Sequence, residues 1–368
     1  MPETSPPAVF TPPPPRRGHP YYMYDAIRAQ PDLVRRVLAA NATGLDAAAA
    51  DLRAAGRAIV TGIGTSFHAA TLGAHFVRTL RAPVEARAVH AFEFAEYHPD
   101  PPAGSAVIVV SHRGTKGYSL RSLEKARAAG AATIAITSTE TAAGVRGAGR
   151  LLLTCEQEAS SAHTKSYTCA LVLLGGLAVR LAGNDGARAA LESVPGHLEG
   201  ILTAEPAVER LARAQAQRSR WIFVGGGPNA VTAFEIALKL RETCYVAAEG
   251  YQVEQILHGP MCAVDGECVV VVIAPPGPSR VRCRDVLRVA STIGAFTVAV
   301  CDEADEEVGL TADARIPLPP MPEVWSPLVS VVPLQLLCYY LALARRTNPD
   351  TFRLDHPRYK EAYSRVKL

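Results

Sequence analysis

An internal repeat restricts this chain to a two-domain fold more strongly than any other feature of its sequence. The segment Arg57–Ser66 (R-A-I-V-T-G-I-G-T-S) corresponds to Arg220–Asn229 (R-W-I-F-V-G-G-G-P-N). A second pair of segments, Gly130–Thr139 and Gly294–Glu303, is separated by the same number of residues to within one. Two copies of one βαβ unit explain both matches. A chain of 368 residues is also long enough to bury two hydrophobic cores.

The order of elements within each copy indicates a parallel α/β sheet. From about residue 45, short apolar runs alternate with Ala- and Leu-rich stretches, which is the pattern of doubly wound sheets. We predict two such domains of flavodoxin-like or Rossmann-like type, at residues 45–190 and 205–345, joined by helical residues around Val194–Ala212. A Pro-rich extended segment is expected over residues 1–20, a helix over 21–44 and a C-terminal tail over 346–368.

Charge, cysteine usage and hydropathy exclude several classes of partner. The net charge is only +3, and no Lys/Arg block is interleaved with aromatic residues, so nucleic acid is not expected as a partner. The eight cysteines form no C-x-x-C pair and several lie in apolar runs, so we expect buried, reduced thiols and neither a metal site nor a cofactor. The N-terminus does not resemble a signal peptide, and apolar runs such as Ala170–Leu181 contain Gly or Arg. A cytoplasmic chain outside the membrane is predicted.

Three charged residues of the second copy form a candidate proton-transfer group. Glu235, Lys239 and Glu242 are spaced i, i+4 and i+7 in the segment Glu235–Thr243, so a helix places them on one stripe. His258 follows in the predicted loop Glu249–Pro260. Carboxylates, an ammonium and an imidazole are groups that transfer protons. The common alternative is an exposed Glu–Lys surface pair, but the intervening residues of the helix are apolar and favour a buried stripe.

Loops of the first copy offer candidate phosphate sites. Gly62–His68 follows a strand and precedes a helix, where free N–H groups favour an anion, and Thr65 and Ser66 add hydroxyl donors. This loop matches neither the G-x-G-x-x-G fingerprint nor a P-loop. Ser111–Ser119 follows an apolar strand and supplies hydroxyl and cationic side chains. Ser160–Ser166 is a third loop of this kind. Ordinary helix capping explains any one of the three, but less readily all three together.

These segments resemble the tandem sugar-isomerase (SIS) domain family, and specifically the isomerase half of glucosamine-6-phosphate synthase (glutamine–fructose-6-phosphate transaminase). The resemblance covers nearly the whole chain after residue 20. It rests on the motifs M-Y-D-A-I-R-A-Q-P, I-G-T-S-F-H, S-H-R-G-T-K and A-H-T-K-S-Y-T. The most specific segment runs from Glu235 to Pro260 and includes E-I-A-L-K-L-R-E-T and H-G-P.

The resemblance implies a role for each candidate residue. Glu242 would be the base that moves a proton between C1 and C2, Glu235 and Lys239 would support it, and His258, supplied by the neighbouring subunit, would assist ring opening. A homodimer with shared active sites follows. The tail at residues 346–368 would close the active site. The phosphosugar would be bound by Gly64, Thr65, Ser66, Ser111, His112, Arg113, Thr115, Lys116, Ala162 and His163.

Three departures separate the chain from that family. No glutaminase domain precedes the repeat and no cysteine precedes Cys155, so glutamine hydrolysis is not expected and a separate glutaminase is a possible partner. The family lysine that forms a Schiff base with the ketose aligns with Ala362. Lys360 or Lys367 could substitute for it, although neither is in register. Arg113 and Lys116 replace a small polar residue and a Thr of the family, which suggests stronger binding of the phosphate or a different sugar.

The prediction from the sequence is an enzyme that acts on a hexose 6-phosphate by aldose–ketose isomerisation with amination or deamination at C2. It would interconvert glucosamine 6-phosphate and fructose 6-phosphate, as a deaminase or as an ammonia-dependent synthase. The alternatives are a 6-phosphofructosamine deglycase and a non-catalytic sugar-phosphate sensor. A sensor needs the phosphate loops but not the Glu235–Lys239–Glu242 stripe or His258, so these residues favour catalysis.

Overall fold

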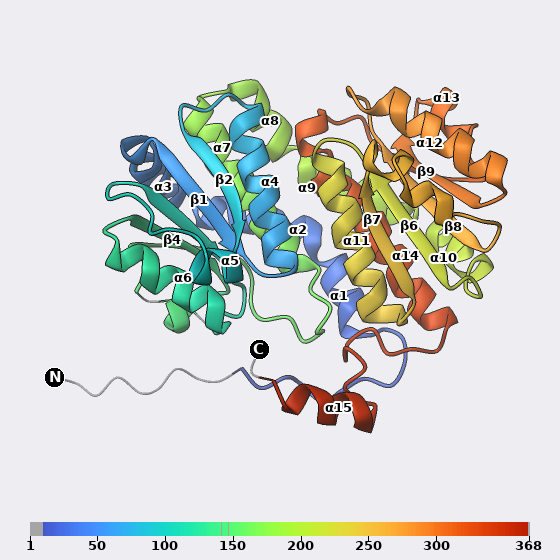
Figure 1. The fold of residues 1–368 in the computed structure, drawn as a ribbon, viewed down its shortest axis with the longest axis horizontal. Helices are drawn as coiled ribbons and strands as arrows, with labels where there is room; N and C mark the ends of the chain where they lie inside the picture. The colour runs from blue at the N-terminus through green and yellow to red at the C-terminus, as the bar shows by residue number, and fades with distance from the viewer. Residues whose placement is uncertain (1–9, 141, 146, 367–368) are drawn as a thin grey trace.

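The computed structural model describes residues 10–140, 142–145 and 147–366, and in them two parallel five-stranded sheets lie side by side (Figure 1). The first sheet has the order β2-β1-β3-β4-β5, and the second has the order β10-β9-β8-β6-β7. When the second sheet is read from its β7 edge, β7, β6, β8, β9 and β10 take the places of β2, β1, β3, β4 and β5. The prediction of two tandem doubly wound α/β domains is confirmed. The strands are β1 (Arg57–Gly62), β2 (Glu85–His90), β3 (Ala106–Val110), β4 (Ala132–Thr137), β5 (Arg150–Leu153), β6 (Arg220–Gly225), β7 (Ala247–Gln252), β8 (Cys268–Ala274), β9 (Phe296–Asp302) and β10 (Ala314–Leu318).

Helices α4 (Thr65–Thr79) and α11 (Pro228–Cys244) are the counterparts that follow β1 and β6, and they face each other across the domain boundary (Figure 1). The rings of Phe76 on α4 and Trp325 lie 5.0 Å apart between centroids, so the two domains share one hydrophobic core. This packing brings the amino end of α4 beside the middle of α11.

The remaining helices connect the strands, cover the sheets or form the ends of the chain. They are α1 (Tyr22–Arg28), α2 (Gln30–Ala40), α3 (Ala42–Ala55), α5 (Ala91–Glu96), α6 (Gly117–Ala128), α7 (Lys165–Ala182), α8 (Asp185–Glu192), α9 (Val194–Thr203), α10 (Glu205–Ala214), α12 (Arg280–Ile293), α13 (Glu306–Gly309), α14 (Ser326–Ala344) and α15 (Pro357–Ser364), with the 3-10 helices η1 (Ala142–Val145), η2 (Gln255–Leu257), η3 (Pro260–Ala263) and η4 (Glu323–Trp325).

The structure corrects three local expectations. The single helix expected over residues 21–44 is three helices. A new helix, α2, starts near Pro31, because proline fits only in the first turn of a helix. The side chain of Asn41, at the junction of α2 and α3, forms hydrogen bonds with the backbone of Leu153. The loop expected from Glu249 begins as strand β7, the edge strand of the second sheet. One of the eight thiols, Cys262, is exposed rather than buried.

Two helical segments are long and apolar enough to cross a membrane by length and composition. They are Lys165–Ala182 and Glu323–Ala344, with mean hydropathies of 1.3 and 1.7. The run Ala170–Leu181 therefore belongs to a longer apolar helix than the sequence suggested. In each segment 89% of the apolar window is buried inside the fold, which is the environment of a core helix.

Of the Pro-rich segment expected over residues 1–20, residues 1–9 lie outside the described part of the chain. Residues 10–20 have no helix or strand and run beside α15 in Figure 1.

Candidate active site

The turn between β1 and α4 is shaped by two glycines. Gly64 adopts a φ of 56°, which an L-residue rarely adopts, and a Cβ on Gly62 would lie 2.6 Å from the backbone carbonyl of Ser66. The close turn starts α4 at Thr65, so Thr65 and Ser66 stand at the amino end of that helix. The sequence predicted free backbone N–H groups here, but those of Ser66 and Phe67 are bonded to the carbonyls of Ile63 and Gly64, because the turn itself is hydrogen-bonded.

Loops of both domains enclose a cavity of about 400 Å³ at this point. The cavity brings together ten of the predicted residues, namely Gly64, Thr65, Ser66, Ser111, His112, Arg113, Lys116, His163, Lys239 and Glu242. Thr115, Ala162, Glu235, His258 and Lys360 are not among its lining residues. The first-domain loops and the α11 stripe therefore form one site.

The end of the cavity near α6 is cationic. Arg113 and Lys116 form no ion pair within 4.0 Å with any carboxylate of the described residues. Burial lowers the pKa of both groups, and the charge of Arg113 lowers the pKa of Lys116 further. The buried Oγ of Ser111 lacks a hydrogen-bond partner in the described part of the chain. Two uncompensated cations and an unsatisfied hydroxyl are suited to bind a phosphate group.

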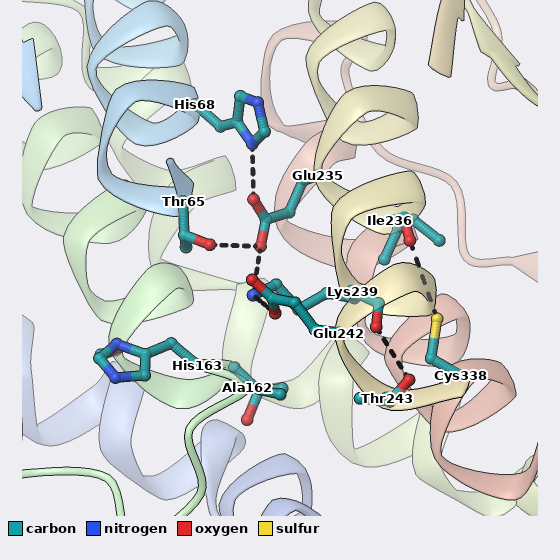
Figure 2. Close-up of polar contacts among 12 residues, drawn as sticks. Thr65, His68, Ala162, His163, Glu235, Ile236, Lys239, Glu242, Thr243 and Cys338 are labelled. Carbon is teal, nitrogen blue, oxygen red and sulfur yellow. Dashed lines mark hydrogen bonds and ion pairs between the residues drawn. The ribbon is translucent and has the colours of Figure 1, made fainter. Parts of the chain in front are cut away.

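The second domain contributes the charged stripe of α11, and Lys239 and Glu242 of this stripe line the same cavity. The side chains of Glu235 and Lys239 are 0% and 1% exposed, which excludes the exposed surface pair. Nζ of Lys239 lies 2.5 Å from Oε2 of Glu242 and 3.5 Å from Oε1 of Glu235 (Figure 2). Burial opposes the charge of Lys239, but the charges of Glu242 and Glu235 outweigh it and raise the pKa of Lys239. Lys239 is therefore a fixed ammonium rather than a nucleophilic amine.

Glu242 has the properties of a general base. Its side chain is 16% exposed and lines the cavity, so a bound ligand can reach it. Burial raises the pKa of Glu242 above its usual range, and this effect outweighs the opposing charge of Lys239. A carboxylate whose pKa is moved toward neutrality can both take and return a proton.

The structure adds residues that the sequence reasoning did not select. His68 Nδ1 and Thr65 Oγ1 lie 2.6 Å and 3.0 Å from the two carboxylate oxygens of Glu235 (Figure 2). The i, i+3 spacing of Thr65 and His68 on α4 is a signal that would have suggested a shared face. The buried Glu158 accepts hydrogen bonds from the backbone N–H groups of Thr164 and Ser166, each 2.9 Å long, and so fixes the third loop. Nothing in the local sequence distinguishes Glu158 from its neighbour Glu156.

Two predicted imidazoles lie on the first-domain side of the cavity. The ring centroids of His112 and His163 are 5.3 Å apart. Burial is the main cause that lowers the pKa of His112 to about 3, and the neighbouring imidazole of His163 contributes to the decrease. Burial also places the pKa of His163 well below its usual value. Both imidazoles are therefore neutral near pH 7.

The C-terminal tail reaches the cavity through apolar side chains. Phe352, Leu354 and Tyr363 line it, whereas Lys360 lies on the exposed helix α15. His258 is also exposed, and its Nε2 lies 2.9 Å from Glu254 on the surface of the second domain. The roles that the resemblance implies for Lys360 and His258 remain predictions.

Comparison with known proteins identifies relatives of both repeats. A model described as the SIS domain matches residues 51–180 and 216–345. The glutamine–fructose-6-phosphate aminotransferase (isomerizing) of Gloeobacter violaceus is 33% identical over 355 residues, which cover 91% of this chain and 58% of the relative. The enzyme of the same name from Thermococcus kodakarensis is 30% identical over 348 residues, or 91% and 57% of the two chains. This chain thus spans a little over half the length of these relatives.

Solved structures show the same fold. The C-terminal domain of glucosamine-fructose-6-phosphate aminotransferase from Francisella tularensis superposes with a TM-score of 0.83 at 24% identity, covering 90% of this chain and 99% of that one. Glucosamine-6-phosphate deaminase from Thermotoga maritima superposes with a TM-score of 0.71 at 20% identity, covering 90% and 97%. At these identities the likeness concerns the fold alone.

Proposed function

The chain belongs to the SIS domain family, and on that premise we propose that it is an enzyme that interconverts fructose 6-phosphate and glucosamine 6-phosphate. One observation carries the proposal. A carboxylate with a raised pKa, Glu242, lies in the same cavity as the unpaired cations Arg113 and Lys116. A proton-transfer group and a candidate phosphate site in one cavity suit isomerisation next to a carbonyl in a sugar phosphate.

The proposed chemistry assigns one task to each end of the cavity. Arg113, Lys116 and Ser111 bind the phosphate and hold C1 and C2 near Glu242. Ammonia replaces the C2 carbonyl oxygen of fructose 6-phosphate as an imine, with loss of water. Glu242 then takes a proton from C1 and returns one to C2, while the proton of the C1 hydroxyl passes to the imine nitrogen, which leaves the aldehyde and amine of glucosamine 6-phosphate. The ammonium of Lys239 orients Glu242 and stabilises negative charge on the substrate oxygen.

The nitrogen source and the quaternary structure belong to the same proposal. Free ammonia or a separate glutaminase supplies the nitrogen, or the enzyme runs in the reverse direction as a deaminase. The resemblance adds a cytoplasmic homodimer in which His258 of the partner subunit assists ring opening.

One observation favours a second candidate, a 6-phosphofructosamine deglycase. The tail residues that line the cavity are Phe352, Leu354 and Tyr363, and none of them is a lysine. Ala362 stands where the Schiff-base lysine of the family aligns, so a reaction that needs no tail lysine fits this cavity equally well.

NMR spectroscopy in heavy water separates these possibilities. The protein is incubated with glucosamine 6-phosphate alone and, separately, with fructose 6-phosphate and ammonium. The proposal expects interconversion with deuterium at C1 or C2. A sensor would bind the sugar phosphate without deuterium uptake. A deglycase would leave both mixtures unchanged but would release the amine from a 6-phosphofructosamine in a third incubation.

A further inference from the structure

His163 lies close to both charged groups of the cavity. It lines the cavity together with Arg113 and Lys116 of the first domain and Lys239 of α11. After burial, the charges of these three cations are what lower the pKa of His163. Figure 2 places His163 on the first-domain side of the Lys239–Glu242 pair. A neutral imidazole therefore stands near both the first-domain cations and the ammonium of α11.

The hydrogen bonds around His163 define its tautomer. Ser166 Oγ donates its only hydrogen to Glu158, which also accepts from the backbone N–H groups of Thr164 and Ser166. Ser166 Oγ can therefore only accept from the Nδ1 of His163, 3.4 Å away. The Nδ1 atom thus carries the hydrogen, and Nε2 is a hydrogen-bond acceptor.

The Nε2 atom of His163 is available to a ligand. Within the described residues no hydrogen bond involves Nε2, and Nε2 is not among the fully buried polar atoms that lack a partner. An atom that is neither bonded nor fully buried, on a side chain that lines the cavity, is accessible from the cavity.

We propose that His163 determines which sugar the enzyme accepts, because its Nε2 accepts a hydrogen bond from one hydroxyl group at C3, C4 or C5 of the bound sugar phosphate. A hexose with its phosphate at Arg113 and Lys116 and its C1–C2 bond at Glu242 spans the cavity past His163. An epimer that turns this hydroxyl away loses the hydrogen bond and leaves a buried polar group unpaired. The role of His163 rests on the proposed function only for the orientation of the bound sugar in the cavity.

The test compares binding of epimers rather than turnover. Dissociation constants are measured by calorimetry for fructose 6-phosphate and its C3, C4 and C5 epimers, which are psicose, tagatose and sorbose 6-phosphate. The unmodified protein is expected to disfavour one epimer by about 10-fold or more. His163→Ala is expected to reduce that ratio to within about twofold, whereas His163→Gln, which keeps a neutral acceptor, retains part of it.

Inorganic phosphate is the control ligand, because it tests the cationic end of the cavity alone. His163→Ala is expected to leave its affinity and the melting temperature within error. An unchanged epimer ratio in His163→Ala, with phosphate binding intact, would refute the role of His163 but not the proposed function. Binding of phosphate but of none of the four sugar phosphates would refute both.

Discussion

The Nδ1 atom of His68 lies 2.6 Å from Oε2 of Glu235, so a hydrogen bond joins α4 of the first domain to α11 of the second (Figure 2). Thr65, one turn earlier on α4, donates to the other oxygen of the same carboxylate. Glu235 in turn lies against Lys239, and Lys239 against Glu242. A chain of polar contacts therefore runs from α4 of the first domain to the proposed base.

Replacing His68 is expected to change the acidity of Glu242. The charge of His68 lowers the pKa of Glu242, so His68→Ala should raise that pKa. Because the base works only when ionised, the rising limb of the pH dependence of kcat/KM should move to higher pH. His75→Ala, about two turns further along α4 and outside the cavity, is the matched control. If the rising limb of the pH dependence does not move in His68→Ala, His68 does not influence the pKa of Glu242.

Glu242→Gln tests the proton transfer directly. The amide cannot take a proton, so we expect turnover and deuterium uptake at C1 and C2 to fall by about 10²- to 10⁴-fold, with phosphate affinity unchanged. Glu267→Gln, an exposed carboxylate outside the cavity, should behave like the unmodified protein. Undiminished deuterium uptake in Glu242→Gln would exclude Glu242 as the base.

Arg113 and Lys116 should affect binding without affecting stability. Each cation contributes a charge-assisted contact to phosphate, so Arg113→Ala and Lys116→Ala should each weaken fructose 6-phosphate binding by about 10- to 100-fold. Both groups are partly buried without an ion-pair partner in the described residues, so the melting temperature of the free protein should stay the same or rise. Arg121→Ala on α6, the helix that follows Lys116, removes an ion pair with Glu96 and controls for loss of charge. If calorimetry shows the same affinity for fructose 6-phosphate in all variants, the phosphate does not bind at Arg113 and Lys116.

Mixed dimers test whether His258 of the partner subunit completes the site. Glu242→Gln and His258→Ala should each be inactive alone. After an equal mixture is unfolded and refolded, about half of the dimers contain one copy of each variant, and one of the two sites in such a dimer is intact. Recovery of about a quarter of the activity of the unmodified protein is therefore expected. No recovery in soluble mixed dimers would place both residues in the site of one chain.

The neutral imidazoles should make the fold sensitive to acid. The folded pKa of His112 is about 3 and that of an unfolded histidine is about 6.5, so the unfolded chain binds the additional proton. The stability due to neutral His112 is complete above about pH 6.5 and is lost as pH falls toward 3, by up to about 1.4 kcal/mol per pH unit. His163 adds a slope of the same sign. Urea unfolding of His112→Asn between pH 7 and pH 5 should show a shallower decline than the unmodified protein, and equal slopes would contradict the assignment.

Much of the fold and part of the site follow from patterns local in the chain. The repeat of Arg57–Ser66 at Arg220–Asn229 predicted two matching sheets, because strand and turn preferences are set by neighbouring residues. The spacing of Glu235, Lys239 and Glu242 predicted a common stripe, because helix geometry alone determines it. The candidate phosphate loops were expected to lie together for a similar reason, since parallel strands end at one edge of a sheet.

Only the tertiary structure decided how these pieces meet. The bond between His68 and Glu235 depends on how α4 packs against α11, and no local preference encodes a contact between residues so distant in the chain. The neutral state of His163 likewise depends on burial among Arg113 and Lys116 of one loop and Lys239 of α11. The sequence by itself thus determined the two sheets, the charged stripe and the candidate phosphate loops, because each depends on neighbours in the chain. The packing of the two domains decided that the charged stripe and the first-domain loops line one cavity, because burial and charge act through space.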